Sequence, residues 1–474
     1  MGKSLRKALK TNPKLWGGRF RKKTDPQFER FSSSLKWDAR LLPYDLKIDA
    51  AHVRALGRCG VLSGKETKKL LAAIDALERR RQSGSLKLDG RAEDVHSAIQ
   101  MELEKLVGEL AYKIHTGRSR NDLVSQSARL YCKEHARTLF SLLVQVQKEI
   151  AAKARGCVRV FVPGMTHLQN AQVVSQAHIF LAYVEMLERV KARIQGAMPF
   201  FDVCVLGSGA LAGAAFPLNQ KRMAKELGLS AIAGNSYDAA GDRDFVLNFL
   251  SCLLFLGIQL SRIAEDWMLR QLNGVSLIEV DQAFCTGSSM MPQKRNADFV
   301  ELLRGAAGIF AGNFFGLVTT LKGLPTSYNR DLQWDKKYLF DSVEVGEEIL
   351  RMTARVVRTL KINKARARML LADESLYATD LADYLAKKGE PFKKAHDQVG
   401  EIVRFAEENG KPISKIGLDI LRTFAPKIDG DVYGLFDPEH SVRMKKTQGS
   451  THPHEVERQI KRWERNLNHA SISL

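Results

Sequence analysis

The sequence predicts an all-α protein built around a bundle of unusually long helices. Apolar residues recur at i, i+3, i+4 and i+7 through long stretches, and runs with the alternation of a β-strand are few and short. Prolines are also scarce within these stretches, so little interrupts a continuous helix. A helix of about 30 residues extends about 45 Å at 1.5 Å per residue. The predicted long helices cover residues 134–157, 175–200, 242–273, 297–322 and 335–361.

We expect the subunit to have three parts. Residues 1–116 read as a mainly helical N-terminal domain, and residues 117–367 hold the long helices of the central bundle domain. Residues 368–474 read as a smaller C-terminal helical domain. Neither an internal repeat nor a low-complexity tract suggests a different division.

Short polar loops separate the long helices. They are rich in Gly, Pro, Ser, Thr and Asn, and they concentrate the charged and hydroxyl side chains of the central region. Rigid helical scaffolds commonly present their functional residues on such connections. The loops are "KIHTGRSRND" (113–122), "VPGMTHLQNAQ" (162–172), "CTGSSMMPQKRN" (285–296) and "GLPTSYNRD" (323–331).

Composition predicts a soluble cytoplasmic protein. The 474 residues are 45% hydrophobic and 27% charged, which is ordinary for a globular chain. The six cysteines lie far apart, without a C-x-x-C pair or a Cys/His cluster, so we expect reduced thiols and no metal site. The most apolar run, residues 245–260, is shorter than the roughly 20 residues of a membrane span, and we expect a buried helix there.

The net charge of +20 does not by itself predict a nucleic-acid partner. Lys and Arg number 73 against 53 acidic residues, but they are spread along the chain and often interleaved with Glu. The sequence contains no recognised nucleic-acid-binding module. We therefore expect no specific nucleic acid, and a diffuse positive field that attracts an anionic metabolite.

The segment "GSSMMPQKRN" (287–296) has two interpretations. Asn296 suits the N-cap of the helix predicted from Ala297, which would make the segment a loop and a cap. Alternatively, Ser288 is catalytic, because Lys294 and the positive end of that helix would stabilise its alkoxide. The residues alone leave both open.

His167 likewise allows a structural and a catalytic interpretation. A histidine in a loop is most often a satisfied hydrogen-bonding group, but it is also the side chain best suited to acid/base work near neutral pH. Glu301, on the helix after the serine segment, could orient such a histidine. Sequence alone does not show that the two residues meet.

Two further loops suit anion recognition. "HTGRSRND" offers Arg120 and Asn121 as donors for a carboxylate, and in "YNRDLQWDKKYLFD" Gln333 and Lys336 share one face of a helical turn. Solvation of a basic surface explains these runs equally well. The G-x-S-x-G elbow of hydrolases, the Walker A motif and a strand-bound G-x-G-x-x-G are all missing, so we expect neither a hydrolase triad nor a nucleotide cofactor.

Together the loops resemble a known enzyme family. "GSSMMPQKRN" is similar to the G-S-S-x-M-P-x-K-x-N signature of the fumarase/aspartase superfamily, and the other motifs are similar to the argininosuccinate lyase family within it. The resemblance implies a reversible, cofactor-free β-elimination of argininosuccinate to L-arginine and fumarate, the last step of arginine biosynthesis. The motifs that carry it are "LWGGRF", "KIHTGRSRND", "PGMTHLQNAQ", "NSYDAAGDRDFVL", "YNRDLQWDK", "ATDLADYLAKKGEPFKKAH" and "VERQIKRWERNL".

The resemblance also implies roles for individual residues. Ser288, activated by Lys294, would remove the carbon proton, and His167, with Glu301 as its charge-relay partner, would serve the leaving group. The family allows the two proton-transfer roles to be exchanged, and that alternative stays open. The implied substrate-binding residues are Ser34, Arg120, Asn121, Thr166, Asn296, Tyr328, Gln333 and Lys336.

The family's assembly is a homotetramer around a multi-helix core, with each active site shared between subunits, and we expect the same here. Some residues beside the matched positions depart from the family pattern, and Leu123 and Trp334 leave strict substrate identity open. The alternatives are another fumarate-releasing lyase of the superfamily and a non-enzymatic, crystallin-like structural homologue. The other departures noted are Met165, Val173 and Ala297.

Overall fold

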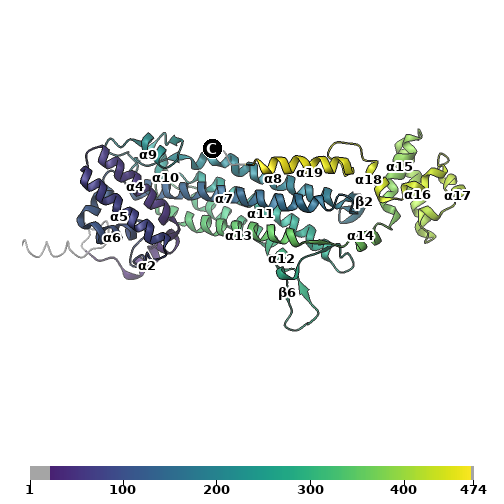
Figure 1. Ribbon diagram of the computed structural model, residues 1–474, viewed down its shortest axis with the longest axis horizontal. Helices are drawn as coiled ribbons and strands as arrows, with labels where there is room; N and C mark the ends of the chain where they lie inside the picture. The colour runs from purple at the N-terminus through teal and green to yellow at the C-terminus, as the bar shows by residue number, and fades with distance from the viewer. Residues whose placement is uncertain (1–21, 471–474) are drawn as a thin grey trace, which may run out of the picture.

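Long helices run along the axis of the molecule and form its central bundle (Figure 1). The computed structural model describes residues 22–470, so the motif "LWGGRF" (15–20) lies outside the described residues. Apart from the start of α7, the bundle helices occupy the ranges that apolar periodicity predicts, and the predicted all-α fold is confirmed. They are α7 (Arg120–Arg155), α8 (Gln176–Phe201), α11 (Asp244–Gln271), α12 (Asp298–Leu321) and α13 (Asp335–Thr359).

Helix α7 begins well before its predicted start at residue 134. Ser119 caps it: its Oγ accepts the Asn121 N–H at 3.3 Å, and the Asp122 carboxylate accepts the Ser119 N–H at 3.0 Å. The first turns bury polar side chains such as Ser125 and Gln126, which hides the apolar period there. Arg120 and Asn121 therefore lie on the first turn of a helix, whereas the sequence predicted a loop over 113–122.

Helix α11 lies in the middle of the bundle and packs against α7, α8, α12 and α13. It approaches α12 so closely that a Cβ added at Gly257 would lie 2.5 Å from the Phe310 ring. Among the described residues, α11 and α12 are long and apolar enough to span a membrane by length and composition. Half of the most apolar window of α11 is buried inside the bundle, as the sequence predicted, against 22% for α12.

A helical cluster forms one end of the molecule (Figure 1). Its helix α4 packs on α5, α6, α7 and α9. The elements at this end are α2 (Pro26–Ser32), α3 (Leu35–Asp38), η1 (Ala39–Leu41), α4 (Leu42–Arg58), α5 (Gly64–Gln82), α6 (Val95–Val107), η2 (Gly108–His115), α9 (Gln220–Glu226) and α10 (Ser236–Gly241). The short 3-10 helix η4 (Arg330–Trp334) leads into α13.

The opposite end has a small core of its own, which includes Leu381, Leu385 and Ile402. The last helix, α19 (Pro453–Asn468), leaves this end and lies along the bundle, where Ile460 and Trp463 join the main core. The sequence-based division placed α19 with the C-terminal domain; the boundaries otherwise stay a prediction. The elements here are α14 (Lys364–Leu370), η5 (Glu374–Tyr377), α15 (Ala378–Lys387), α16 (Phe392–Glu408), η6 (Ile413–Lys415), α17 (Leu418–Phe424), η7 (Gly430–Leu435) and α18 (Pro438–Arg443).

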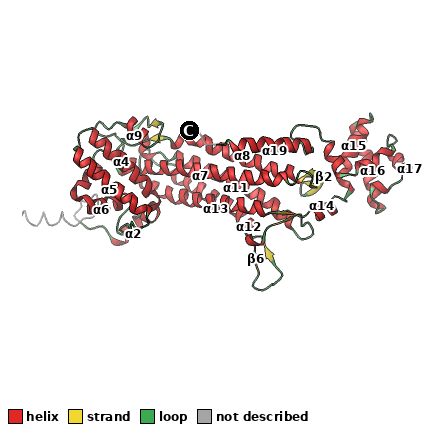
Figure 2. Ribbon diagram, viewed as in Figure 1, coloured by secondary structure: helices red, strands yellow, loops and turns green. Residues whose placement is uncertain are grey.

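The described strands form short two-stranded pairs (Figure 2). The longest is the antiparallel hairpin of β1 (Phe161–Thr166) and β2 (Gln169–Ser175), where the sequence predicted a loop. His167 and Leu168 turn the chain with φ of 54° and 60°, the left-handed geometry that suits a two-residue hairpin turn. The other pairs are β3 (Val203–Cys204) with β4 (Ala231–Ile232), β5 (Ile278–Glu279) with β8 (Lys361–Ile362), and β6 (Thr286–Gly287) with β7 (Arg295–Asn296).

Candidate functional site

The predicted site residues fall into three groups that lie apart within one chain (Figure 1). The binding group, at the N-terminal end, comprises Ser34, Arg120, Asn121, Tyr328, Gln333 and Lys336. The histidine hairpin is β1–β2, which carries Thr166 and His167 near the opposite end. The serine loop, residues 285–297, protrudes between them with Ser288, Lys294 and Asn296, and Glu301 follows it on α12.

The binding group is joined by Glu93. The Ser34 N–H donates to the Glu93 carbonyl oxygen at 2.9 Å, and Arg120 donates to the Glu93 carboxylate at 3.0 Å. Gln333 donates from Nε2 to the carbonyl oxygen of Ser32 at 3.1 Å. These hydrogen bonds bring together residues that are some 300 positions apart in sequence. Residues of one site must lie together in this way.

Lys336 is a buried cation within this group. Its Nζ donates to Asp335 Oδ1 at 3.2 Å, and Ser34 donates from its hydroxyl to the neighbouring Asp38. Burial opposes the charge of Lys336, but the carboxylates of Asp335 and Asp38 outweigh burial and raise its pKa. The ammonium therefore stays charged in a setting with little water, where its attraction for an anion is strong.

Beneath the binding group lies a buried histidine that sequence reasoning missed. His96 on α6 pairs with Asp45, and Asp94 and Asp38 also face it. Burial opposes protonation of the ring, but Asp45 outweighs it and the pKa of His96 rises to about 9. Asp94 in turn lies 3.5 Å from Arg120. The signal in the sequence was "EDVH", in which Asp94 is the N-cap of α6 and His96 falls in the first turn of that helix.

The start of α7 is tied to a glycine-rich segment, residues 205–217. Asn121 donates to the Ala210 carbonyl oxygen at 3.1 Å, and the Asp122 carboxylate accepts the N–H groups of Gly207 at 3.2 Å and Gly209 at 2.9 Å. Burial raises the pKa of Asp122 to about 6. This segment, which lacks the features of a nucleotide motif, lines the binding group instead.

The histidine hairpin presents its side chains to solvent. Thr166 and His167 are both exposed at the turn, and Leu168 beside them is 68% exposed. The base of the hairpin packs on α14, α18 and η5, and its last residue, Ser175, caps α8 by accepting the Ala177 N–H at 3.2 Å. The hairpin is thus held at its base while its tip is open to a partner.

Hydrogen bonds link the two ends of the serine loop and fix the turn that follows Ser288. Thr286 donates from its N–H and its hydroxyl to Asp298 Oδ2 at 2.8 and 2.5 Å. Ser288 Oγ accepts the N–H groups of Met290 at 3.2 Å and Met291 at 3.0 Å. Two such donors lower the cost of negative charge on the serine oxygen, as in an oxyanion hole.

The predicted capping role of Asn296 is wrong. Asn296 lies in β7, and Ala297 occupies the N-cap position of α12 without a side-chain hydrogen bond. The Asp298 carboxylate, which supports the loop through Thr286, stands in the first turn of α12 instead. Among residues 22–470, neither a hydrogen bond nor an ion pair links His167 to Glu301 or to Ser288.

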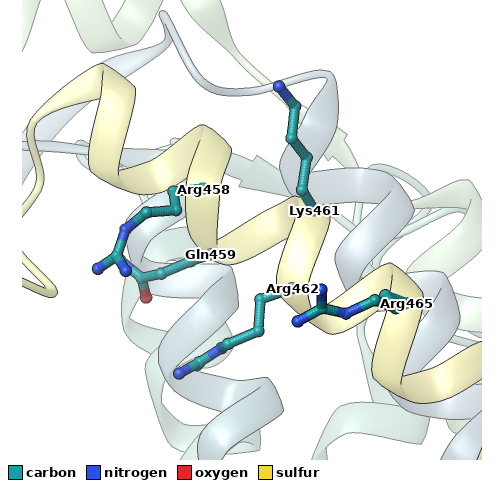
Figure 3. Close-up of a pocket in the computed structure, with 5 residues that line it drawn as sticks. All are labelled: Arg458, Gln459, Lys461, Arg462 and Arg465. Carbon is teal, nitrogen blue, oxygen red and sulfur yellow. The ribbon is translucent and has the colours of Figure 1, made fainter.

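A basic hollow of about 290 Å³ lies elsewhere, on α19 (Figure 3). Arg458, Arg462 and Arg465 are directed to one side of the helix there, and Lys461 points away from them. Arg458 pairs with Glu455 at 2.7 Å and Arg462 pairs with Glu185, so part of this charge is already neutralised. The hollow holds none of the predicted site residues.

Comparison with known proteins gives matches over nearly the whole chain. Residues 18–312 match the family described as Lyase, and residues 375–443 match Argininosuccinate lyase C-terminal. An argininosuccinate lyase of Desulforudis audaxviator is 41% identical over 454 residues, which cover 96% of this chain and 99% of the relative. One of Bacillus velezensis is 40% identical over 447 residues, with coverage of 94% and 98%.

Solved structures give the same result for the fold. An EDDS lyase variant with bound fumarate superposes with a TM-score of 0.80 at 26% identity, over 94% of this chain and 91% of the other. Class II fumarase from Schistosoma mansoni superposes with a TM-score of 0.72 at 17% identity, over 86% and 91%, which bears on the fold alone.

Proposed function

Because this chain belongs to the argininosuccinate lyase family, we propose that it cleaves argininosuccinate to L-arginine and fumarate by the residues described above. The chain is a carbon–nitrogen lyase, and identity of about 40% over nearly its full length with argininosuccinate lyases is the observation that carries this conclusion. We further propose that it acts in the cytoplasm.

The reaction makes three chemical demands. The proton to be removed lies on a carbon beside a carboxylate and is only weakly acidic, so a base must stand against it. Negative charge then builds on that carboxylate and must be stabilised. Finally, the departing guanidino nitrogen needs a proton.

Ser288 suits the first demand. The two backbone N–H groups that its oxygen accepts favour the alkoxide, and Lys294 lies in the same loop as a source of positive charge. We assign Lys294 and Asn296 to the carboxylate on which charge builds. The serine is a proton-transfer group in this mechanism and forms no covalent bond to the substrate.

His167 suits the third demand. Its exposed ring at the tip of a hairpin can approach the leaving nitrogen, directly or through Thr166, and Glu301 of another chain would orient it. The binding group would hold the substrate through Arg120, whose guanidinium matches a carboxylate, and through the buried ammonium of Lys336.

We propose that these groups meet in a homotetramer. Within one chain they lie apart, so a site that uses all three needs more than one subunit. Helix α12 supports such an assembly, because Leu302 and Ile309, seven positions apart, are 71% and 42% exposed, and Phe315 on another side of the helix is 59% exposed. Large apolar side chains left exposed on one helix suit an interface.

The test is release of fumarate, followed by its ultraviolet absorbance, from argininosuccinate and separately from adenylosuccinate, aspartate and malate. We expect turnover of argininosuccinate alone, and its loss in Ser288→Ala and in His167→Asn. His454→Asn, at an exposed histidine on α19, is the matched control and should keep full activity. A tetramer that releases fumarate from another of these compounds would support the alternative lyase, and one that releases none would support the crystallin-like alternative.

A further inference from the structure

The segment Gly241–Asp244, "GDRD", contacts Ser327 and Asp335, the residues directly before Tyr328 and Lys336 of the binding group. Helix α10 ends at Gly241, which packs against the backbone of Ser327, one residue before Tyr328. A Cβ added at Gly241 would lie 2.7 Å from Ser327 Cα and closer still to its carbonyl group. Ser327 has φ of 70°, a conformation that side-chain-bearing residues rarely adopt. The backbone of Ser327, which leads directly into Tyr328, can therefore sit here only beside a glycine.

A second contact lies two residues further along the same segment. Arg243 is fully buried, and its Nε donates to the buried Asp335, which also accepts the Lys336 ammonium at 3.2 Å. Burial opposes ionisation of Asp335, but Lys336 and Arg243 hold its pKa below the ordinary value. The carboxylate thus stands charged between two cations, and Arg243 fixes the point to which Lys336 is bound.

The segment is in turn anchored to α7. The Asp242 carboxylate binds the Arg129 guanidinium and accepts the Asp244 N–H at 2.7 Å. Arg129 also lies over the Phe245 ring, 4.3 Å from its centroid. Since α7 carries Arg120 and Asn121 on its first turn, one segment connects the two halves of the binding group.

We propose that Gly241, Asp242 and Arg243 form a positioning element that sets the affinity for argininosuccinate, by fixing Tyr328 and Lys336 relative to Arg120 on α7. This inference rests on the proposed function. The element lies at the N-terminal end of the molecule, and its described contacts are with Ser327, Asp335, α7 and its own neighbours. It should therefore govern substrate binding and leave proton transfer by Ser288 and His167 nearly unchanged.

The test compares Gly241→Ala and Arg243→Lys with two matched controls. Gly400→Ala adds a methyl group where nothing lies within 4 Å, and Asp202→Asn weakens another buried ion pair, with Lys133, that contacts none of the binding group. Each variant is assayed for KM, kcat and thermal unfolding. Substrate Kd is measured by calorimetry in the inactive Ser288→Ala background.

We expect Gly241→Ala and Arg243→Lys to raise KM and Kd about tenfold or more, equivalent to about 1.4 kcal/mol, with kcat within about threefold of wild type. Lysine keeps the charge of Arg243 but loses its planar fork. Both controls should leave KM unchanged. If Gly241→Ala fails to fold, Arg243→Lys carries the test alone.

Unchanged KM and Kd in the folded variants, with a thermal midpoint lowered as in Asp202→Asn, would reduce the element to a structural role. A fall in kcat at constant KM would also overturn the inference. Failure of the proposed function is seen separately, in the wild type, which would then release no fumarate from argininosuccinate. If the wild type cleaves another of the compounds, the same comparison of variants is made with that substrate. A wild type that cleaves none of them overturns both the proposed function and this inference.

Discussion

Replacing His96 by glutamine should remove a pH-dependent part of the stability. The ordinary histidine pKa of 6.5 rises to about 9 in the fold, because the attraction of Asp45 outweighs the burial that opposes protonation. This rise in the pKa of His96 is worth about 3 kcal/mol of unfolding free energy. The folded protein favours the protonated ring, so this stabilisation is fully present below pH 6.5 and is lost as pH rises through 9.

The assay is the free energy of unfolding in urea at one fixed protein concentration, from below pH 6.5 to above pH 9. We expect the wild type to lose about 3 kcal/mol more than His96→Gln across this window. His52→Gln is the control with the opposite sign. Burial, with Arg118, lowers the pKa of His52 to about 3, so its neutral ring costs stability only as pH falls below 6.5.

Parallel curves for the wild type and His96→Gln between pH 6.5 and 9 would refute this reasoning. The ring would then be neutral in the fold, and Asp45, Asp94 and Asp38 would have to share protons instead. With a neutral ring, His96 would also supply no positive charge beneath Arg120 and Ser34 of the binding group.

Three further changes test the fold and the serine loop. Gly257→Ala should lower the unfolding free energy in urea by about 1–3 kcal/mol, because the added methyl group would overlap Phe310. A cost near zero would show that α11 and α12 can move apart freely. Ser119→Ala should cost about 1 kcal/mol in the same assay through loss of the α7 cap, and an unchanged midpoint would contradict that role. Asp298→Asn weakens the hydrogen bonds from Thr286 that support the serine loop, so kcat should fall several-fold while the unfolding free energy stays unchanged. An unaltered kcat would count against this role of Asp298.

The fold could be predicted where one face of a helix is continuously apolar. The long helices have that pattern, and each was found within a few residues except the start of α7. There many of the buried side chains are polar, Ser125 and Gln126 among them, so the apolar period disappears. The β1–β2 hairpin was missed because Pro163 and Gly164 read as loop residues, although both lie in the first strand of the hairpin.

The candidate site could be predicted only in part, for a different reason. Residue types and motifs indicated Ser288, His167 and the binding group, but tertiary structure alone brings Glu93 to Arg120 and Arg243 to Asp335. The buried charges of His96 and Arg243 are likewise invisible in sequence, since their partners lie on other elements. How the three groups meet depends on the packing of subunits, which the sequence of one chain does not determine by any local pattern.

Mixing two inactive variants tests the central claim, that the active site is assembled from different subunits. Ser288→Ala and His167→Asn chains are unfolded together in equal amounts, refolded and assayed for fumarate release from argininosuccinate. If the serine and histidine of a site come from different chains, about one quarter of the sites in random tetramers hold both intact residues, and about one quarter of wild-type activity should return. If both residues come from the same chain, the mixture stays as inactive as either variant alone, and the account is contradicted.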